Sequence, residues 1–212
     1  MSASKISVAK KAMSLIKNKL TNNMVLGIGT GSTVNYFIDE LADHKNYFYG
    51  AVSSSEATSK LLIENSIQVL NLNDVNEIEF YIDGADEVSD EQFLIKGGGG
   101  AHTREKIVAS AANEFICIVD KSKLVAELGD FPLPVEVIPE SRSLVSRKLL
   151  AMGGIPKYRE NFITDQGNQI IDIHSLKITN PVDLEKNINS IAGVVDNGIF
   201  AINKPDVVLV SD

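Results

Sequence analysis

The sequence has a single cysteine, no long apolar run and no block of basic residues, and each shortage excludes a class of protein. Cys117 is the only cysteine, so no disulfide can form within the chain. It lies in the apolar run FICIV, where we expect a buried thiol. No apolar run approaches the roughly 20 residues that a membrane-spanning helix needs. The first 20 residues are amphipathic and lack the apolar core of a secretory signal, so we expect a cytoplasmic protein without membrane contact.

The charge of the chain restricts its partners. The formal net charge is −8, and no five lysines or arginines follow one another, which excludes general nucleic-acid binding. An anionic ligand would therefore have to be held by a few placed lysines and by backbone N–H groups, against an unfavourable overall field. His44, His102 and His174 are far apart and have no cysteine or paired carboxylate at ligand spacing, so no metal site is expected.

Apolar strands alternate with amphipathic helices in the first 128 residues. Strands are expected at 24–29, 48–53, 67–70, 79–83, 93–96 and 115–120, and helices at about 6–20, 32–41, 55–65 and 103–113. This order predicts an α/β fold, with a mostly parallel sheet that carries helices on both faces.

The pattern changes after Leu128. The segment GDFPLP (129–134) is typical of a linker. Strands are expected at 135–138, 161–164, 169–174 and 193–202, with a hairpin turn at 165–168 and helices at 141–152 and 181–189. The order β-α-β-β-α-β predicts an inserted ferredoxin-like α+β domain over 129–204. The apolar run 206–211 is expected to rejoin the first sheet, so that the α/β catalytic domain comprises 1–128 with 205–212.

The segment GIGTGST (27–33) lies between an expected strand and an expected helix. Such a turn directs backbone N–H groups and a positive helix end at one point, which suits a phosphate. Ser32 replaces the third glycine of a dinucleotide fingerprint, and the Gly-Lys-Ser/Thr of a nucleotide P-loop is absent. The hydroxyls of Thr30, Ser32 and Thr33 add further donors. The alternative is that the glycines only form the turn and Ser32 only caps the helix.

Two carboxylates follow the expected strand 79–83. Asp83 and Asp86, in DGADE (83–87), are separated by the small residues Gly84 and Ala85, so both can approach one small substrate. A solvated acidic turn is the commoner fate of such residues. Their position at the carboxyl end of a strand, where ligands bind in open α/β sheets, favours a function instead.

The segment KGGGGAHTREK (96–106) is the most specific signal. Its four glycines leave backbone N–H groups unshielded and free to adopt positive φ, as close approach to a ligand requires. Lys96 ends the expected strand, and Glu105 lies in the first turn or two of the next helix. The helix dipole would keep that carboxylate ionised, as a proton acceptor must be, although Glu105 could also serve the dipole alone.

Together, TGST (30–33), DGADE (83–87), KGGGGAHTREK (96–106) and PLPVEVIP (132–139) resemble the ribose-5-phosphate isomerase A family. The resemblance continues through FITDQGNQIIDIH (162–174) and IAGVVDNGIFA (191–201), in the same order and at matching separations. It implies a parallel-sheet domain with a ferredoxin-like insertion, a homodimer, and no metal, nucleotide or flavin cofactor.

The resemblance also implies roles for individual residues. Glu105 matches the proton-transferring base, and Asp83, Asp86 and Lys96 complete the catalytic set. The implied substrate-binding residues are Lys10, Thr30, Gly31, Ser32, Thr33, Asp83, Gly84, Ala85, Asp86, Lys96, Gly97, Gly98, Gly99 and Lys123. Spacing alone does not choose between Lys10 and Lys11, or between Lys121 and Lys123. His102 departs from the family, which usually has an apolar residue there; we expect it to point outward rather than to tune the local field.

The implied reaction interconverts D-ribose 5-phosphate and D-ribulose 5-phosphate through an enediolate, with Glu105 moving the proton. Three alternatives stay open at this stage. A sugar-phosphate sensor would keep the phosphate turn but could discard the base. A nicotinamide-dependent dehydrogenase would rest on GIGTGS alone, and a CoA-transferase-like activity on the sheet alone. The presence of Glu105, Asp83 and Asp86 together favours the isomerase.

Overall fold

A computed structural model describes residues 2–211, which form two compact units. The first unit contains the residues up to Gly84, Arg104–Lys123 and the residues from Pro205 on; the second contains Ala85–Thr103 and Leu124–Lys204. Residues 85–103 and 124–128 belong to the second unit, although they precede the predicted inserted domain. The predicted domain boundaries, drawn at 129 and 204, stay a prediction.

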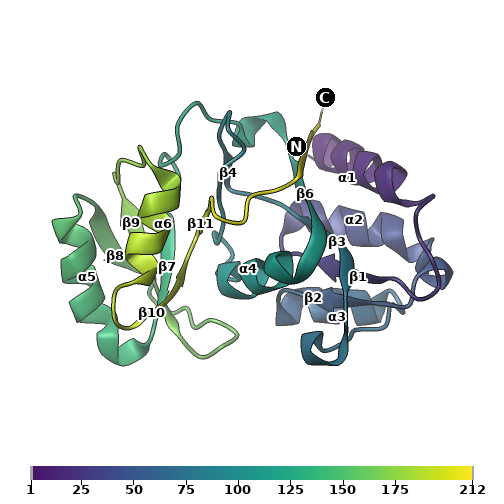
Figure 1. The fold of residues 1–212 in the computed structure, drawn as a ribbon, viewed down its shortest axis with the longest axis horizontal. Coiled ribbons are helices and arrows are strands. Elements are labelled where there is room, and N and C mark those ends of the chain that lie inside the picture. The colour runs from purple at the N-terminus through teal and green to yellow at the C-terminus, as the bar shows by residue number, and fades with distance from the viewer. Residues whose placement is uncertain (1, 212) are drawn as a thin grey trace. The chain divides into compact units, whose positions relative to one another are not determined.

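The first unit is built on a five-stranded sheet in the order β12-β6-β3-β1-β2 (Figure 1). Its strands are β1 (Val25–Ile28), β2 (Gly50–Ser53), β3 (Ile78–Asp83), β6 (Ala112–Val119) and β12 (Val207–Val210), and all four neighbouring pairs are parallel. The predicted return of the last strand is confirmed, because Val207–Val210 pair with Ile116–Val119.

Helices cover both faces of this sheet, as predicted. They are α1 (Ser2–Ile16), α2 (Ser32–Ala42), α3 (Glu56–Glu64) and α4 (His102–Ala111). Apolar side chains of α1 and α2 share one core cluster with Ile28, Phe80 and Ile118 of the strands. On the other face, α4 packs so closely that a side chain at Gly27 would lie 2.9 Å from Val108. Glycine at this position therefore permits the close contact between helix and sheet.

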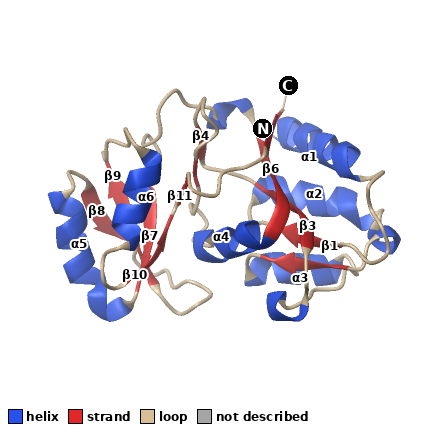
Figure 2. Ribbon diagram, in the orientation of Figure 1, coloured by secondary structure: helices blue, strands red, loops and turns tan. Residues whose placement is uncertain are grey.

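The second unit contains a four-stranded antiparallel sheet in the order β10-β7-β9-β8 (Figure 2). Its elements are β7 (Leu133–Val137), α5 (Arg142–Ala151), β8 (Ile155–Tyr158), β9 (Gln169–His174), α6 (Pro181–Asn189) and β10 (Val194–Asn197). The predicted β-α-β-β-α-β order is thus confirmed. Val135, Val145, Leu149, Ile171 and Ile188 form the centre of its apolar core.

The predicted hairpin has a different first strand. Ile155–Tyr158, not 161–164, pairs with β9. Asn161 has a positive φ of 56°, and the Thr164 amide donates to the Asn168 carbonyl at 2.9 Å, so 161–168 turns instead of extending. Pro156 fits β8 because β8 is an edge strand, where one side of the backbone needs no partner.

Three other predicted strands differ as well. The segment 93–96 contributes β5 (Leu94–Ile95) to a separate three-stranded sheet, between β4 (Glu87–Val88) and β11 (Ile199–Phe200), and both pairings are antiparallel. The segment 193–202 divides into β10 and β11 at Gly198, where a side chain would overlap the Lys96 carbonyl. The segment 67–70 makes only an isolated parallel bridge, between Val69 and Ala51.

Two further findings concern predictions about the chain as a whole. Cys117 is buried, as predicted. Among residues 2–211, the helices are too short or too polar to cross a bilayer.

Candidate active site

The carboxyl ends of β1 and β3 meet at the point where the sheet reverses its strand order. From β1 the chain continues through α2 to β2 on one side, and β3 lies on the other side of β1. Ligands of open α/β sheets bind beyond the carboxyl ends of the strands at such a reversal. The Gly29 amide donates to the Ile82 carbonyl at 2.9 Å, and the Thr30 amide donates to Asp83 Oδ1 at 3.1 Å. The structure therefore brings together two of the three motifs that the sequence singled out.

At this edge of the sheet, the side chain of Asp83 accepts hydrogen bonds from three other residues of the first unit. Its side chain is fully buried. Oδ1 accepts hydrogen bonds from the amides of Thr30 and Gly84, the latter at 2.7 Å, and Oδ2 accepts one from the Tyr81 hydroxyl. Asp83 thus joins the end of β3 to the turn after β1.

Tyr81 is a residue that sequence reasoning missed. It is fully buried, and its ring lies 5.1 Å from that of Phe115, centroid to centroid. Burial, and next the negative charges of Asp83 and Glu105, raise the pKa of Tyr81 well above its usual value, so that the phenol stays protonated and donates a hydrogen bond to Asp83. The charge of Glu105 acts on Tyr81, which places Glu105 in the same neighbourhood as Asp83. An aromatic residue within an apolar strand gave no signal for this role.

A pH titration of tyrosine absorbance tests the state of Tyr81. We expect Tyr81→Phe to leave the absorbance change near pH 10 unaltered, because the buried phenol of the native protein does not ionise there. In denaturant, where the phenol is exposed, the wild-type protein should show a larger change than the variant, since it has five tyrosines and the variant has four. A smaller change near pH 10 in the native variant would mean that Tyr81 ionises normally.

The TGST turn is shaped by Gly31. This residue precedes α2 with φ 126° and ψ 169°, a conformation that residues with side chains rarely adopt. The Ser32 side chain does not cap the helix; its Oγ instead accepts a hydrogen bond from Lys5 Nζ at 2.7 Å. The alternative in which Ser32 only caps the helix therefore does not describe this side chain. A hollow of about 410 Å³ lies beside the turn, lined by Thr30, Gly31 and Ser32 together with side chains of α2 and α3.

The Thr30 hydroxyl faces a cluster of other hydroxyls rather than the hollow alone. Thr30 Oγ1 lies 2.8 Å from both Ser54 Oγ and Ser55 Oγ, and Thr58 Oγ1 donates to the Gly29 carbonyl at 2.8 Å. These contacts fix the backbone of the turn from the side of α3. The positioning of this turn thus depends on residues that no sequence motif marks.

The lysine that contacts this turn is Lys5, which was not among the predicted residues. Lys10 lies 3.8 Å from Glu40 and is largely exposed, and the structure does not bring it to Ser32. Lys5 occupies that place. It precedes the buried Val8 and Ala9 by three and four residues, so it continues the buried stripe of α1 by one turn, which is the signal that was overlooked.

Lys123 lies in the same neighbourhood as Lys5. The Ser122 hydroxyl, which donates to Asp120, lowers the pKa of that carboxyl most, and the charges of Lys123 and Lys5 lower it further. Because both lysines act on Asp120, the structure brings Lys123 toward the end of α1 that carries Lys5. Lys5, Lys123 and the amino-terminal end of α2 therefore lie in one region of the first unit.

Glu105 lies in the first turn of α4, as predicted, and is 4% exposed. The amino-terminal end of a helix favours the ionised form of a carboxyl. The neighbouring Arg104 turns away toward solvent and pairs with Glu56 at 2.8 Å. The helix thus presents a buried carboxylate and an exposed cation at successive positions, and only the carboxylate belongs to the candidate site.

In the second unit, Asp86 and the glycine segment contact each other. The Gly98 amide donates to Asp86 Oδ2 at 2.8 Å. Lys96 is 2% exposed, its amide donates to the Gly198 carbonyl at 2.9 Å, and its ammonium lies 5.4 Å from the centre of the Phe200 ring. A buried lysine is uncommon unless it is paired or functional.

The expectation that His102 points outward is wrong. Its side chain is fully buried, and its Nε2 lies 3.4 Å from the Asp196 carbonyl oxygen. A side chain at Gly97 would lie 2.6 Å from His102 Nδ1, so the imidazole fills the space beneath the glycine segment. Gly97 therefore has to be a glycine for two reasons: the imidazole leaves no room for a side chain, and other residues rarely adopt its φ of 101°.

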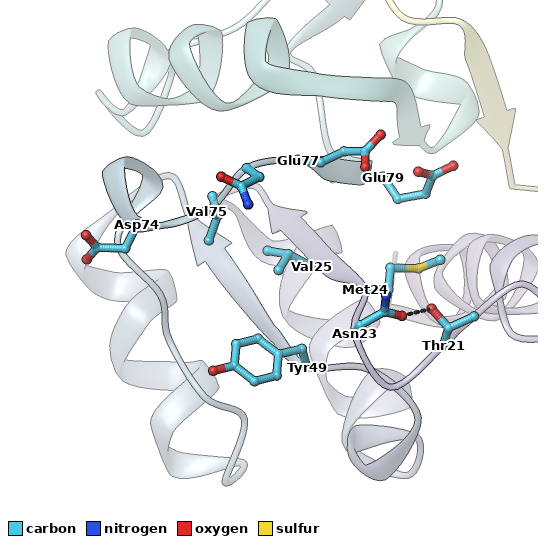
Figure 3. A pocket seen from close by; sticks show the side chains of 10 residues that line it. Thr21, Asn23, Met24, Val25, Tyr49, Asp74, Val75, Glu77 and Glu79 are labelled. Atoms are coloured by element: carbon cyan, nitrogen blue, oxygen red, sulfur yellow. Dashed lines mark hydrogen bonds between the residues drawn. The ribbon is translucent and has the colours of Figure 1, made fainter.

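A second hollow of the first unit lies at the opposite end of the strands (Figure 3). It measures about 420 Å³ and is lined by Asp74, Glu77 and Glu79 beside Tyr49 and the start of β1. Three carboxylates and no basic side chain would repel a phosphate. An anionic ligand therefore belongs at the carboxyl ends of the strands.

The fold and these residues define a class: an α/β protein that combines a glycine-containing turn at a helix start with buried carboxylates at the carboxyl edge of a parallel sheet. Comparisons with known proteins identify the family. The family model for ribose 5-phosphate isomerase A (phosphoriboisomerase A) matches residues 50–212, and the chain belongs to this family.

Solved structures agree over nearly the whole chain. The ribose 5-phosphate isomerase A of Neisseria gonorrhoeae is 49% identical, with a TM-score of 0.92 over 99% of this chain and 92% of its own. The enzyme of Methanocaldococcus jannaschii is 43% identical, with a TM-score of 0.92 over 100% of this chain and 95% of its own. A D-ribose-5-phosphate isomerase in complex with phospho-erythronic acid is 37% identical, with the same TM-score and the same coverage as the archaeal enzyme.

Proposed function

We propose that this chain is an aldose–ketose isomerase that interconverts D-ribose 5-phosphate and D-ribulose 5-phosphate in the non-oxidative pentose phosphate pathway. The observation that carries the proposal is the buried carboxylate of Glu105 in the first turn of α4, in a chain of the ribose 5-phosphate isomerase A family. A relative of 37% identity is in complex with phospho-erythronic acid, a phosphorylated sugar acid, which supports a small sugar phosphate as the substrate.

The proposed reaction is a proton transfer between neighbouring carbons. Glu105 removes the proton from C2 of the open-chain aldose, the electrons of that C–H bond form the C1=C2 double bond, and the carbonyl π electrons move to O1, giving an enediolate. Glu105 then returns the proton to C1, while the proton of the C2 hydroxyl is transferred to O1, so that C2 becomes the carbonyl carbon of the ketose. Positioned acid–base catalysis of this kind accelerates a reaction by roughly 10²–10⁴. The helix dipole supports the ionised carboxylate with which the cycle begins.

The negative charge that develops on the carbonyl oxygen needs stabilisation. We propose that Lys96 and those N–H groups of the glycine segment 97–99 that Asp86 does not engage supply it, because donors aimed at a developing charge usually contribute the largest electrostatic effect in an active site. Asp86 is proposed to exchange protons with substrate hydroxyl groups and to assist ring opening. Gly84 and Ala85 leave room for the substrate beside it.

Asp83 has a proposed double role. It is proposed to act on substrate hydroxyls like Asp86, and its three hydrogen-bond donors support a second role as the fixed centre of the site in the first unit.

The phosphate is proposed to bind at the turn formed by Thr30, Gly31, Ser32 and Thr33. Lys123 is retained from the sequence prediction, and its proximity to Lys5 near Asp120 supports it. Lys5 is added because its ammonium already contacts Ser32. Lys10 stays a prediction of the resemblance alone. Binding energy from the phosphate orients the reacting carbons, which raises the rate without direct contact with them.

A direct assay tests the proposal. Purified protein mixed with ribose 5-phosphate should form ribulose 5-phosphate, with no added cofactor and with undiminished rate in the presence of EDTA. Binding of ribose 5-phosphate without turnover would favour the sensor instead. Turnover that requires a nicotinamide or a CoA thioester would favour one of the other two alternatives, and turnover that EDTA abolishes and a divalent ion restores would favour a metal-assisted isomerase.

Two further expectations from the sequence stay proposals. These are the homodimer, which the family resemblance implies, and the cytoplasmic location. Sedimentation of the purified protein tests the first, and microscopy of a tagged chain in its own cell tests the second.

A further inference from the structure

Arg159 is a cation that neither the sequence motifs nor the proposed reaction uses, and it contacts the glycine segment. It follows β8 directly, and its side chain is 18% exposed. Nη1 donates to the carbonyl oxygens of Gly97 and Gly98 at 3.3 and 3.2 Å, and Nη2 donates to that of Gly97 at 3.3 Å. One guanidinium thus holds two successive peptide groups of the second unit.

Asp172 holds the guanidinium in this position. Arg159 Nε donates to Asp172 Oδ2 at 2.8 Å, and Nη2 donates to Oδ1, so the pair is bidentate. Both side chains are mostly buried. The planar fork of arginine allows it to bind a carboxylate and still present donors to the two carbonyls. Lysine has a single ammonium on a flexible stem and lacks this geometry.

The direction of the carbonyls fixes the direction of the amides. In a trans peptide, the C=O of one residue and the N–H of the next point in opposite directions, and no cis peptide occurs among residues 2–211. The Gly97 carbonyl points to Arg159, and the Gly98 amide correspondingly points to Asp86, to which it donates at 2.8 Å. The Gly98 carbonyl also points to Arg159, so the Gly99 amide must point away from the guanidinium.

The turn that contains these peptides is tight and open on its outer side. The Gly100 amide donates to the Gly97 carbonyl at 2.9 Å, which closes the turn. Gly99 is exposed, and a side chain at Gly99 would meet no atom within 4 Å. At the other end, a side chain at Gly100 would overlap the Phe162 ring, which lies 5.3 Å from the Arg159 guanidinium carbon. Phe162 and Arg159, from the segment between β8 and β9, thus both contact the turn.

From this geometry we infer that Arg159, held by Asp172, is a positioning residue that directs the Gly99 N–H at the oxyanion of the enediolate. This inference rests on the proposed function and deepens it, because it selects one main-chain donor from the glycine segment. The Gly98 N–H is engaged by Asp86, and Gly99 carries the donor for the developing charge. Arg159 contacts neither the substrate nor the reacting atoms.

Kinetics of Arg159→Lys and Arg159→Gln test the inference, with Arg147→Gln as the control, since Arg147 is exposed on α5 of the same unit. Loss of an oxyanion-hole donor lowers kcat by about 10²–10³. Because Arg159 acts only through the direction of such a donor, we expect kcat to fall about 10-fold to 100-fold in both variants, with KM for ribose 5-phosphate changed less than about 3-fold. Wild-type kcat in Arg159→Lys would overturn the inference, and so would a rise in KM that accounts for the whole loss of kcat/KM.

Binding of phospho-erythronic acid separates positioning from folding. Its carboxylate carries the negative charge that the enediolate develops, so its Kd should rise by about the factor by which kcat falls, while inorganic phosphate binds as in the wild type. In ¹⁵N-labelled wild-type protein, the Gly99 amide resonance should move on titration with phospho-erythronic acid, and should move less in Arg159→Lys. An unmoved Gly99 resonance in an active wild-type enzyme would refute the inference, whereas a wild-type protein without isomerase activity would refute the proposed function first.

Discussion

Replacement of Glu105 by glutamine should lower kcat for ribose 5-phosphate by about 10²–10⁴, with KM changed only slightly. Glutamine has nearly the size and shape of glutamate, so the buried site in the first turn of α4 can hold it. It has no basicity at neutral pH, however, and cannot take a proton from carbon. The phosphate contacts at the TGST turn stay in place, so substrate binding should persist. Measurement of product formation, together with calorimetric titration with ribose 5-phosphate, checks both halves of this expectation.

A matched control separates the loss of a base from the loss of a charge. Glu140→Gln removes one negative charge from an exposed position of the second unit and should leave kcat and KM unchanged. A second check uses the thermal midpoint of unfolding, which should be similar in wild type and in Glu105→Gln. If Glu105→Gln keeps more than about a tenth of the wild-type kcat, Glu105 is not the base.

Replacement of Gly29 by alanine should strongly lower the free energy of unfolding. A methyl group at this position would overlap the carboxyl group of Asp83. Asp83 cannot move aside without breaking its hydrogen bonds from Thr30, Gly84 and Tyr81. Overpacking of a tight core costs typically about 1–3 kcal/mol, and each buried donor left unsatisfied costs about 1–3 kcal/mol more. Isomerase activity should fall with the displacement of Asp83.

Gly84→Ala is the comparison for stability, because it adds the same methyl group at the residue that directly follows Asp83. At Gly84 the nearest atom, the Ile118 carbonyl oxygen, would lie at an ordinary contact distance of 3.7 Å. Urea unfolding of the two variants should therefore give a clearly lower free energy of unfolding for Gly29→Ala. Equal stabilities would mean that the turn after β1 can relax, and that Asp83 is less firmly held than its contacts indicate.

Hydrophobic patterns within single helices and strands predicted most of the fold. The buried stripe of α1, the apolar runs of β1 and β3, and the proline at the start of α6 each act within one element, where the sequence carries the information locally. The strands β5 and β11 lie within predicted strand segments, but β4 was missed because it has only two residues, too few to establish a period. In 161–168, a local turn closed by the hydrogen bond from Thr164 to Asn168, with a positive φ at Asn161, outweighed the strand-like residues Phe162 and Ile163.

The candidate site was predictable where glycines and acids follow one another in the sequence. Those motifs identified the turn after β1, the end of β3 and the glycine segment. The residues that hold them in place were not predictable, because they come from distant positions: Lys5 contacts Ser32 across 27 positions, and Arg159 contacts Gly97 across 62. Neither Tyr81 nor Arg159 belongs to a motif with its partner, so only the folded chain reveals what they do.

The pairing of β12 with β6 affects how the protein is made. The Phe115 amide donates to the Asp206 carboxylate at 2.8 Å, and these two residues are 91 positions apart. A ribosome must therefore synthesise the whole intervening second unit before the parallel sheet receives its last strand. Until then β6, whose second half is buried in the finished protein, forms an apolar sheet edge that can pair with other chains. Nascent chains stalled in the second unit should aggregate more readily than the complete enzyme, and chaperone dependence should end when Val207–Val210 leave the exit tunnel.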